Sequence, residues 1–417
     1  MNSKQRRPSV LIVGLNYAPE PTGNAPYTTA LAEGLLGMGH AVSVVTGYPH
    51  YPDWKASKRY RGLRDTEVAN GVPVKRVRHT VPRSHRLFPR LLMEITFGLH
   101  AAFVRWNTCD VVLVVSPALF GSAFAIAKAA LFRTPVVIWV QDLYSRGIEE
   151  ISGKRGWIWR LVRALESRIM RACDGVTVIH ERFRDYVVQD LGVPNSKVAV
   201  IPNWTHITPS EKFDREAVRQ RFAWASNEII ALHAGNMGMK QGLENVIEAA
   251  RVADRSSSMV RFVLLGDGNR RRALEEIATG VVRLDFMRPL EDAEYVDALR
   301  SADVLLLNEA EGLREMSVPS KLTSYFAVGQ PIVAATHPSS AASGELSRSG
   351  GGWRVNPGDP EALLQAVERL GTNSLAAEKM GKQGKVYART LLRETGAVTA
   401  HSHWLSNIPG AEPASRQ

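Results

Sequence analysis

Short runs of aliphatic residues alternate with longer segments of helical periodicity along most of the chain. In the first half these runs predict strands, and two of the intervening segments predict helices. We expect strands at Val10–Leu15, Ala41–Thr46, Val72–Val77, Val111–Ser116, Pro135–Val140 and Gly175–Ile179, and helices at Thr28–Met38 and Ile158–Ala172. Because the strands are apolar throughout and helices separate them, they predict a parallel sheet covered on both faces.

The same alternation starts again in the second half, after an apolar run at Val198–Asn203 and a polar stretch at 205–216. The expected elements are Ile229–His233, Val246–Ala253, Val260–Leu265, Arg283–Phe286, Tyr295–Arg300, Val304–Leu307 and Pro331–Ala335. The pattern therefore predicts two doubly wound α/β domains joined near residue 205. In open parallel sheets ligands bind outside the carboxyl ends of the strands, so two such domains facing each other would place the active site in a central cleft.

Composition agrees with a folded protein, and the charge is unevenly placed. The chain has 417 residues, of which 45% are hydrophobic and 22% charged, which excludes a mainly disordered or fibrous protein. Residues 1–200 hold 27 basic and 15 acidic side chains, and the remaining residues hold 25 and 26. The excess positive charge thus belongs to the first half, which indicates that this half faces an anionic partner.

Cysteine content and apolar run length bear on the compartment. The two cysteines, Cys109 and Cys173, are too few for a disulfide framework or a zinc site, so a reducing cytosol is expected. No run reaches the roughly 18 to 20 apolar residues that span a bilayer. The nearest candidates are interrupted by Glu94 and Lys128. We expect a soluble or surface-attached protein.

Two segments of the first half, Arg83–Met93 and Gly156–Arg171, mix arginines with bulky apolar residues at helical spacing. Such helices can lie in the surface of an anionic bilayer. They can equally pack their apolar side on a core and leave the arginines in solvent. Given the charge of this half, we favour membrane association.

Two turns of the first half follow expected strands. In the turn over Asn16–Tyr27, Gly23 allows close backbone approach, and the helix N-terminus beyond it suits a phosphate or sugar oxygen. An ordinary strand-to-helix loop would look the same, and the G-x-G-x-x-G pattern is absent. Asp142 ends the strand at 135–140, where a carboxylate faces a ligand cleft or caps the next helix.

The second half contains three further turns at strand ends. The stretch Ala234–Glu244 holds three glycines and Lys240, which suits a cradle for a diphosphate, although a glycine-rich turn with a solvated lysine is the alternative. Leu264–Asn269 is another, weaker, glycine turn. Phe286–Pro289 would present backbone groups to a nucleobase edge or form a plain loop.

The most distinctive stretch is Asn308–Val333. Ser317 and Ser320 precede Lys321, which starts a helix expected over Leu322–Ala327. The hydroxyls, the helix N-terminus and the lysine together suit a second phosphate contact, and a capped surface helix is the alternative. No H-E-x-x-H or Cys/His spacing is present, so we expect no metal site.

Several segments, in this order, resemble the family 4 glycosyltransferases of the GT-B fold. The matching pieces include NYAPEPTGNAPY from Asn16, GNMGMKQGLENVIEAA from Gly235 and VPSKLTSYFAVGQPIVAA from Val318. The nearer likeness is to the WcaI/WbuB-like subgroup of bacterial polysaccharide enzymes, which act in colanic acid and O-antigen synthesis. These pieces extend over nearly the whole chain.

The resemblance implies a retaining transfer of a sugar from a nucleotide diphosphate sugar, which is the donor substrate, with no further cofactor and no metal. The sugar would be fucose or an N-acetylamino-deoxyhexose, and the acceptor a lipid-linked oligosaccharide. It implies an acceptor-binding Rossmann-like domain at 1–205, a nucleotide-sugar-binding Rossmann-like domain at 206–388, a helix at 389–410 that packs back on the first domain, and a disordered tail at 411–417.

The resemblance also implies roles for individual residues. Asp142, Lys240 and Lys321 would be catalytic, the two lysines by neutralising the leaving diphosphate. The donor would contact Gly23, Asn24, Gly235, Asn236, Gln241, Gly266, Phe286, Met287, Arg288, Ser317, Ser320 and Ser324. The acceptor would contact Tyr17, Tyr27 and Tyr144. Because the leaving phosphate can accept the acceptor proton, a dedicated base such as Asp142 is not required.

Some positions depart from the family pattern. Many members carry two glutamates eight residues apart, where this chain has Met316 and Ser324. Asn236 stands at a common arginine, and Gln241 at a common lysine, with Lys240 one residue earlier. Phosphate binding would therefore depend more on the two lysines and on backbone donors.

The expected partners are a nucleotide sugar, a lipid-linked saccharide and an anionic membrane surface, and the expected location is the cytoplasmic face of the plasma membrane. A nucleotide-sugar epimerase of the same fold is the alternative. A nicotinamide oxidoreductase is disfavoured because G-x-G-x-x-G with a downstream acid is missing. We expect no nucleic acid as a partner, because no recognition module is present.

Overall fold

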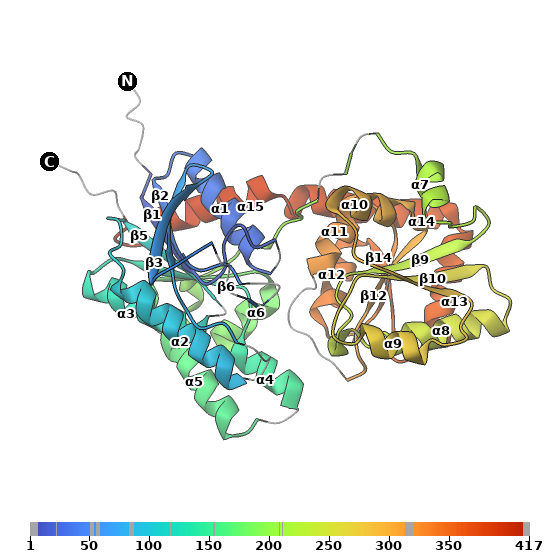
Figure 1. The fold of residues 1–417 in the computed structure, drawn as a ribbon, viewed down its shortest axis with the longest axis horizontal. Coiled ribbons are helices and arrows are strands. Elements are labelled where there is room, and N and C mark those ends of the chain that lie inside the picture. The colour runs from blue at the N-terminus through green and yellow to red at the C-terminus, as the bar shows by residue number, and fades with distance from the viewer. Residues whose placement is uncertain are drawn as a thin grey trace. The chain divides into compact units, whose positions relative to one another are not determined.

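The computed structural model describes residues 7–21, 23–50, 54–55, 59–82, 87–116, 118–152, 155–207, 209–210, 212–312 and 320–411. The chain divides into two compact units (Figure 1). Unit 1 takes in residues 1–203 and 394–417, and unit 2 takes in residues 204–393.

Unit 1 is built on a sheet that has eight strands within the described residues, in the order β3-β4-β2-β1-β5-β6-β7-β8. The strands are β1 (Val10–Gly14), β2 (Val42–Gly47), β3 (Arg64–Ala69), β4 (Val72–Val77), β5 (Val111–Val115), β6 (Val136–Val140), β7 (Gly175–Val178) and β8 (Val198–Val200). Neighbours pair in parallel, except that β3 pairs antiparallel with β4. The central strands β1, β2, β5 and β6 are buried at every residue, which is why their sequences are apolar on both faces.

The edge strand β3 was not expected from the sequence. Its residues, RDTEVA, are mostly exposed, so they lack the apolar run that indicates a buried strand. The hairpin to β4 turns at Asn70 and Gly71, which both have positive φ (48° and 82°). An Asn-Gly pair of this kind favours a tight two-residue hairpin turn, and it was the available signal for β3.

Helices cover both faces of this sheet. They are α1 (Ala25–Gly37), α2 (Leu87–Phe103), α3 (Leu119–Leu131), α4 (Tyr144–Ser152), α5 (Trp157–Ala172), α6 (Glu181–Asp185) and α15 (Glu394–Ser406). Figure 1 shows α1 beside α15, and α2 beside α3. The axes of α2 and α3 come close because two glycines meet, and a Cβ on Gly98 would lie 2.8 Å from the Cα of Gly121.

The last helix, α15, packs on α1 of unit 1. A Cβ on Gly34 would lie 2.8 Å from both methyl groups of Val398, so the glycine permits this contact. Nearby, Nε2 of His40 lies 2.7 Å from Oγ of Ser402. The C-terminal helix thus returns to the first domain, as the expected fold requires. Of the tail expected at 411–417, the structure describes Ala411 alone.

Unit 2 has a second parallel sheet, with six strands within the described residues, in the order β11-β10-β9-β12-β13-β14. The strands are β9 (Ile229–Ala234), β10 (Val260–Leu265), β11 (Leu284–Met287), β12 (Val304–Asn308), β13 (Ile332–Ala335) and β14 (Gly352–Val355). Successive residues of β9 alternate between two apolar cores: Ile230 and Leu232 belong to one, and Ile229 and Ala231 to the other. This alternation is the pleat of a strand that is buried on both faces.

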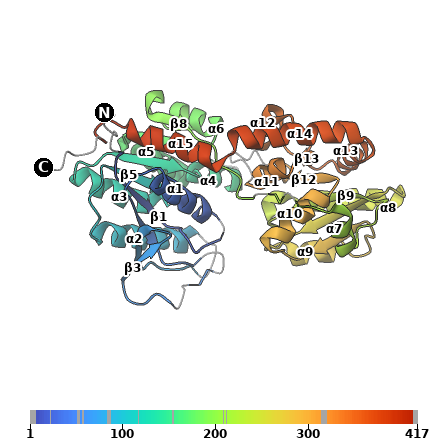
Figure 2. The ribbon, with the colours of Figure 1, turned by 90° about the horizontal axis from the view of Figure 1, so that it is seen from above.

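The helices of unit 2 are α7 (Arg215–Arg221), α8 (Glu244–Arg255), α9 (Arg271–Ile277), α10 (Asp292–Ser301), α11 (Ser320–Val328), α12 (Ala341–Ser349), α13 (Pro360–Thr372) and α14 (Ser374–Leu391). Helices α8 and α13 pack together against one core, and α10, α11 and α14 contribute to the other. Figure 2 shows α12, α13 and α14 together along this unit. Among the described residues, no helix combines the length and apolarity needed to cross a bilayer.

Candidate functional site

In each sheet the strand order reverses direction at one pair of neighbouring strands. In unit 1 this pair is β1 and β5, and in unit 2 it is β9 and β12. Loops leave the carboxyl ends of such a pair in opposite directions and open a crevice, which is where doubly wound proteins bind ligands. A ligand site is therefore expected among the residues that follow these four strands.

Unit 1 has a cavity of about 370 Å³ at its reversal point. It is lined by Leu15, Asn16, Asn24, His50, Trp54, Arg90, Met93, Glu94, Val115, Ala118 and Tyr144. The size lies in the range of small-molecule pockets. Of the site residues expected from the sequence, Asn24 and Tyr144 reach this cavity.

Asn24 connects the two loops that border the cavity. It is the residue before α1, but its side chain does not cap that helix. Its Nδ2 instead donates to the backbone oxygen of Ser116, 3.3 Å away, just after β5. The preceding Gly23 has φ +68°, a conformation that favours glycine, and so allows the turn into α1.

Tyr144 joins two buried glutamates. Its hydroxyl donates to Glu94 of α2, and its backbone N–H donates to Oε1 of Glu166 of α5, 2.6 Å away. Burial raises the pKa of each glutamate from 4.5 to about 7, although hydrogen bonds from their neighbours oppose the shift. Sequence reasoning did not identify either acid, although Glu94 interrupts an otherwise apolar segment.

Both glutamates cap helices that begin at strand ends. Glu94 accepts from the backbone N–H of Phe120, 3.3 Å away, in the first turn of α3. Glu166 also accepts from the N–H of Ser145, 3.1 Å away, in the first turn of α4. The free N–H groups of a helix N-terminus suit a carboxylate, so α2 and α5 supply caps for α3 and α4.

Asp142 follows β6 but is not among the residues that line the cavity. Its side chain is exposed, and its Oδ1 accepts the backbone N–H of Leu143, 2.8 Å away. Leu143 lies before α4 (Tyr144–Ser152), so this contact is not the helix cap that the sequence offered as the alternative for Asp142.

Tyr17 and Tyr27, the other expected acceptor contacts, are buried inside unit 1 and do not line the cavity. They are 1% and 6% exposed. Burial raises the pKa of both phenols, that of Tyr27 to about 12, and Glu33 adds to the shift of Tyr17. The structure therefore places both rings in the core beneath the first loop.

A polar cluster behind this loop was also missed. His50 lies with Nδ1 3.2 Å from Oε1 of Glu20, and its backbone N–H donates to the same oxygen at 2.8 Å. The other carboxylate oxygen accepts from Asn16 at 2.8 Å. His79 packs edge-on against His50, and burial lowers the pKa of His79 to about 4. The signal available in the sequence was the histidine of YPHYP, which has a proline within two residues on each side.

In unit 2, glycines let the loops after β9 and β10 approach each other. Gly235 and Gly266 have φ of +134° and +137°. A Cβ on Gly266 would lie 2.0 Å from the backbone oxygen of Gly235, and one on Gly268 would lie 2.5 Å from that of Met237. The glycine density noted in the sequence is thus needed for packing of one loop on the other.

Gly235 also faces Lys321 of α11. A Cβ built on Gly235 would lie 3.6 Å from both Cε and Nζ of Lys321. The ammonium lies 3.3 Å from Nε2 of His233, the strand residue just before the turn. Burial and the neighbouring Lys321 lower the pKa of His233 well below 6.5. The imidazole is therefore neutral and accepts a hydrogen bond from the ammonium, which has donors alone.

The N–H groups of this turn already have partners. Those of Gly235 and Met237 donate to the backbone oxygens of Leu265 and Asp267, each 2.8 Å away. That of Gly238 donates to Oε1 of Gln241 at 3.0 Å, and this closes the short 3-10 helix at Met239–Gln241. The sequence predicts that the backbone N–H groups of this turn bind a diphosphate. These three N–H groups instead donate to atoms of the protein.

The remaining expected residues lie around these strand ends. Asn236 is exposed beside Gly268, and Lys240 is half-buried in the 3-10 helix, where its backbone oxygen accepts from Ala310 at 2.8 Å. Phe286 and Met287 end β11, followed by the exposed Arg288. Arg271, which the sequence did not indicate, donates to the backbone oxygens of Gly266 and Met287 and so holds the ends of β10 and β11 together.

Two of the three expected serines can be placed. Ser320 is exposed at the first residue of α11. Ser324, one turn later, hydrogen-bonds the hydroxyl of Tyr295 in α10, whose pKa burial raises to about 12. Ser317 lies outside the described residues. Glu309, after β12, is buried and accepts from the hydroxyl of Thr336.

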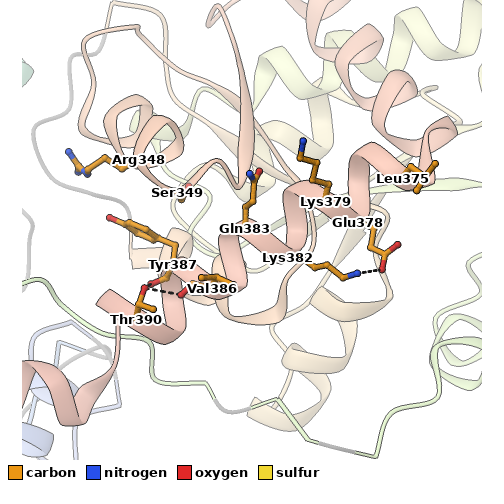
Figure 3. A pocket seen from close by; sticks show the side chains of 10 residues that line it. All are labelled: Arg348, Ser349, Leu375, Glu378, Lys379, Lys382, Gln383, Val386, Tyr387 and Thr390. Carbon is orange, nitrogen blue, oxygen red and sulfur yellow. Dashed lines mark hydrogen bonds and ion pairs between the residues drawn. The ribbon is translucent and has the colours of Figure 1, made fainter.

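A second hollow, of about 670 Å³, lies on the opposite edge of unit 2. It is lined by Arg348, Ser349, Leu375, Glu378, Lys379, Lys382, Gln383, Val386, Tyr387 and Thr390. Figure 3 shows that most of these side chains come from successive turns of α14, with Lys382 paired to Glu378 at 2.6 Å. Arg348 and Ser349 come just before β14, at the amino end of the sheet. None of the expected site residues is among those that line this hollow.

Within the described residues, no three or more His, Cys, Asp or Glu side chains cluster in a way that would hold a metal ion. The ionisable groups at the two strand reversals instead include Lys321 and His233 in unit 2, and Glu94, Arg90 and His50 in unit 1.

Two family models match the two units. Residues 22–204 match the model described as "Glycosyl transferase 4-like domain", and residues 228–373 match the one described as "Glycosyl transferases group 1".

Two curated proteins are similar along the chain. One is the putative colanic acid biosynthesis glycosyl transferase WcaI of Escherichia coli (strain K12), which is 30% identical over 404 residues, 92% of this chain and 97% of that protein. Another is the probable glycosyltransferase WbjE of Pseudomonas aeruginosa, 28% identical over 307 residues, which are 69% of this chain and 74% of that protein.

Solved structures share the fold at low identity. Sucrose-phosphate synthase from Thermosynechococcus elongatus matches with a TM-score of 0.70 and 16% identity, over 95% of this chain and 98% of its own. HepE of Anabaena, in complex with UDP, matches with a TM-score of 0.69 and 13% identity, over 96% and 100%. These likenesses confirm the expected fold class of two Rossmann-like domains.

Proposed function

Because the chain belongs to family 4 of the glycosyltransferases, among its WcaI-like members, we propose that it transfers a sugar from a nucleotide diphosphate sugar to a lipid-linked oligosaccharide in bacterial polysaccharide synthesis. The transfer retains the anomeric configuration. Fucose and an N-acetylamino-deoxyhexose are the sugars that the resemblance favours. The matched families and relatives do not support the epimerase alternative.

The observation that carries this proposal is the contact of Lys321 with His233 beside Gly235. Cleavage of a glycosyl–phosphate bond leaves extra negative charge on the diphosphate, and a cation held in place before the reaction stabilises that charge. Lys321 is held in position because the buried, neutral imidazole of His233 accepts a hydrogen bond from its ammonium group at the strand reversal of unit 2. Lys240, on the neighbouring loop, is proposed to act with it.

The proposed transfer needs no separate base. The oxygen of the leaving diphosphate accepts the proton of the attacking hydroxyl as the new glycosidic bond forms on the same face. Asp142 stays a candidate for this proton, and its exposed carboxylate suits proton exchange with solvent. Lysine ammonium groups take the part that a divalent cation has in other transferases, so we propose that the enzyme needs no metal and no cofactor besides its donor.

The test compares lysines of unit 2 in the full-length enzyme. UDP-, GDP- and dTDP-sugars are first screened by thermal shift, since a ligand of the native state raises its melting temperature. With the donor so found, Lys321→Ala and Lys240→Ala should each lower kcat/KM on the order of 10²-fold or more. Lys382→Ala, on exposed α14, is the matched control and should leave kcat/KM unchanged.

Near wild-type turnover of both variants would refute the leaving-group role. Chelation with EDTA should not change the rate, and a loss that Mg²⁺ restores would refute the proposed metal independence. Product analysis by NMR distinguishes retention from inversion at the transferred sugar.

We also propose that unit 1 binds the cytoplasmic surface of an anionic membrane. On α5, Trp157 and Leu161 are 74% and 61% exposed, next to the exposed Arg160. Apolar side chains beside arginines suit the boundary between lipid headgroups and acyl chains. Other residues of the helix, such as Trp159 and Ile169, are buried, so α5 both packs on the unit and presents apolar groups outward.

Vesicle binding of the full-length protein tests this surface. Vesicles that contain phosphatidylglycerol should bind it at low salt and release it as salt rises, because salt screens the attraction. The double variant Trp157→Ala, Leu161→Ala should bind more weakly, whereas Leu375→Ala, at an 80% exposed position of unit 2, should not. Equal binding to vesicles of phosphatidylcholine alone would contradict the proposal.

A further inference from the structure

Helix α14 packs tightly on unit 2 with one face and exposes the other. A Cβ on Gly381 would lie 2.0 Å from the backbone oxygen of Gly329. A Cβ on Gly351 would lie 2.7 Å from the Cα of Gly384. Because backbone meets backbone at these glycines, the inner face of α14 is held close to the unit, and the outer face is a rigid surface.

The outer face of α14 carries two apolar residues with two lysines between them. Leu375 and Val386 are 80% and 60% exposed, and about 16 Å of helix separates them. Lys379 and Lys382 lie between them on the same side, because spacings of four, three and four residues follow the period of a helix. These four residues, which we call the α14 stripe, line the hollow of about 670 Å³ (Figure 3).

The wall beside the α14 stripe is held in place by a buried glutamate. Glu345 of α12 accepts from the hydroxyl of Tyr387 at 2.6 Å and from the guanidinium of Arg348. The ring of Tyr387 also packs edge-on against Phe326, with 5.5 Å between the ring centres. The hollow is therefore formed before any partner binds, which lowers the entropy lost on association.

The hollow has an excess of positive charge, although the second half of the chain as a whole does not. Helix α14 contains four basic residues and one acidic residue. The acid, Glu378, pairs with Lys382 at 2.6 Å, whereas Lys379 has no ion pair within the described residues. Such a concentration of cations attracts an anionic partner and opposes a cationic one.

The order of residues in the α14 stripe disfavours a membrane and a second copy of the chain. In a helix that lies in a bilayer surface, the apolar residues form a face of their own and the cations lie on the other face. Here the lysines interrupt the apolar residues. Two copies of α14 packed antiparallel would pair the apolar ends but would place lysine against lysine, and like charges in contact oppose association.

We propose that the hollow along α14 binds an acidic amphipathic helix of another protein. Apolar side chains of that helix contact Leu375 and Val386, and its carboxylates pair with Lys379 and Lys382. A helix laid in a groove, with anchors spaced by helical turns, is a recurrent mode of recognition. Since the interface is one helix long, the complex is transient. The inference goes beyond the proposed function and does not depend on it.

A model peptide tests this surface with the full-length protein. An alanine-rich peptide of about 18 residues is long enough to form a helix. It carries two leucines and two glutamates at the spacings of the α14 stripe, which are the same read in either direction. Fluorescence anisotropy should give a Kd on the order of 10–100 μM at low salt, and salt should weaken the binding. A peptide of equal composition with its glutamates on the opposite face should bind at least tenfold more weakly.

Reversal of charge assigns the site. The double variant Lys379→Glu, Lys382→Glu should bind the glutamate peptide at least tenfold more weakly and should bind a peptide that has lysines in place of the glutamates. Leu375→Ala removes one apolar anchor and should weaken the glutamate peptide several-fold.

The double variant Lys212→Glu, Arg272→Glu is the matched control, with the same change of net charge at exposed positions of unit 2. Arg272, like Lys382, is paired with a glutamate one turn away, at 3.1 Å. This control should bind the glutamate peptide as the wild type does. Circular dichroism and the melting temperature verify that each variant is folded.

Three results would overturn the proposal: no binding of the glutamate peptide, equal affinity for the two glutamate peptides, or equal affinity in the charge-reversed and control variants. A loss of binding to phosphatidylglycerol vesicles in the charge-reversed variant alone would assign the surface to a membrane instead. A wild-type dimer that the charge-reversed variant alone changes would assign it to a second copy. No nucleotide or sugar takes part in the peptide assay, so its failure leaves the proposed transfer reaction unaffected.

Discussion

The ammonium of Lys321 lies 3.3 Å from Nε2 of His233, across the strand reversal of unit 2. His233 is fully buried at the end of β9, and Lys321 is the second residue of α11. Their contact fixes the lysine beside Gly235 before any ligand arrives. A cation held in advance needs no reorganisation during the reaction, which is the condition for strong charge stabilisation.

We predict that His233 acts as a positioning residue for Lys321. His233→Leu removes the acceptor and should lower kcat/KM about tenfold, since it loosens the lysine without removing its charge. His233→Gln keeps an acceptor oxygen and should restore most of the loss. Steady-state kinetics of both variants, with affinity for the nucleoside diphosphate and for the nucleoside alone, measure the effect.

The nucleoside is the internal control, because it has no diphosphate for Lys321 to bind. A purely structural role of His233 would weaken nucleoside and nucleoside diphosphate alike and would not distinguish leucine from glutamine. That pattern would contradict the prediction.

A second prediction concerns the packing of two loops at Gly266. Gly266→Ala places a Cβ 2.0 Å from the backbone oxygen of Gly235, and φ is +137°, so both loops must move. We expect the free energy of unfolding of unit 2 to fall by ~3 kcal/mol or more. We also expect the protein to lose nucleotide binding. Thermal unfolding and nucleotide titration measure both effects.

Gly280→Ala is the matched control. Gly280 has φ of +83° but no atom within 4 Å of a built Cβ, so alanine there brings backbone strain without a clash. Its cost should be about 1 kcal/mol, with nucleotide affinity unchanged. A Gly266→Ala protein as stable as this control, with normal nucleotide affinity, would refute the proposed loop packing.

The third prediction uses the buried carboxylate of Glu166. Burial raises its pKa from 4.5 to about 7. Below pH 4.5 the group is protonated in both the folded and the unfolded chain and contributes no pH dependence. Between pH 4.5 and 7 the folded chain holds more protons than the unfolded one, so the free energy of unfolding falls as pH rises, by up to ~3 kcal/mol.

Glu166→Gln removes this titration. The variant loses one of two caps on α4 at every pH, but relative to the wild type it should gain stability as pH rises from 5 to 8. Denaturant unfolding at the two pH values measures the change. Histidines with lowered pKa, such as His79 and His401, titrate in both proteins and cancel in the difference.

The control for this series is Glu378→Gln on the surface of α14, where the side chain is exposed and paired with Lys382. It should show no gain with rising pH, because Lys382 lowers the pKa of Glu378 and thereby favours its charged form. A parallel pH dependence of wild type and Glu166→Gln would show that Glu166 does not titrate in this range.

Most strands could be predicted from the sequence, because a strand buried on both faces must be apolar throughout. This applies to runs such as Val111–Val115 and Val260–Leu265, which also fixed the domain type. The strands that were missed, Arg64–Ala69 and Gly352–Val355, are short and exposed or only partly buried, so hydrophobicity does not mark them.

The site residues also differ in whether the sequence alone could predict them. Gly235 and Lys321 could be proposed because each follows a strand end in a recognisable motif. His233 could not, because a single histidine in the apolar strand IIALHA gives no sign of a partner 88 residues away in the chain. The caps from Glu94 and Glu166 likewise depend on the packing of separate helices, which periodicity along one helix does not reveal.

The last prediction concerns the contact that ties α15 to α1. A Cβ on Gly34 would lie 2.8 Å from both methyl groups of Val398, which is stiff and cannot turn away without losing its rotamer. Gly34→Ala should therefore destabilise this contact by about 1–3 kcal/mol, although alanine itself favours a helix. Hydrogen exchange of the α15 amides and the melting temperature report the loss.

Gly37→Ala separates the clash from the change of helix propensity. Gly37 lies in the same helix with no atom within 4 Å of a built Cβ, so alanine there should be neutral or slightly stabilising. Val398→Ala should restore exchange protection in the Gly34→Ala protein, because it removes the methyl groups that the new Cβ meets. A double-mutant cycle without coupling between positions 34 and 398 would mean that α15 is held by other contacts, such as that of His40 with Ser402.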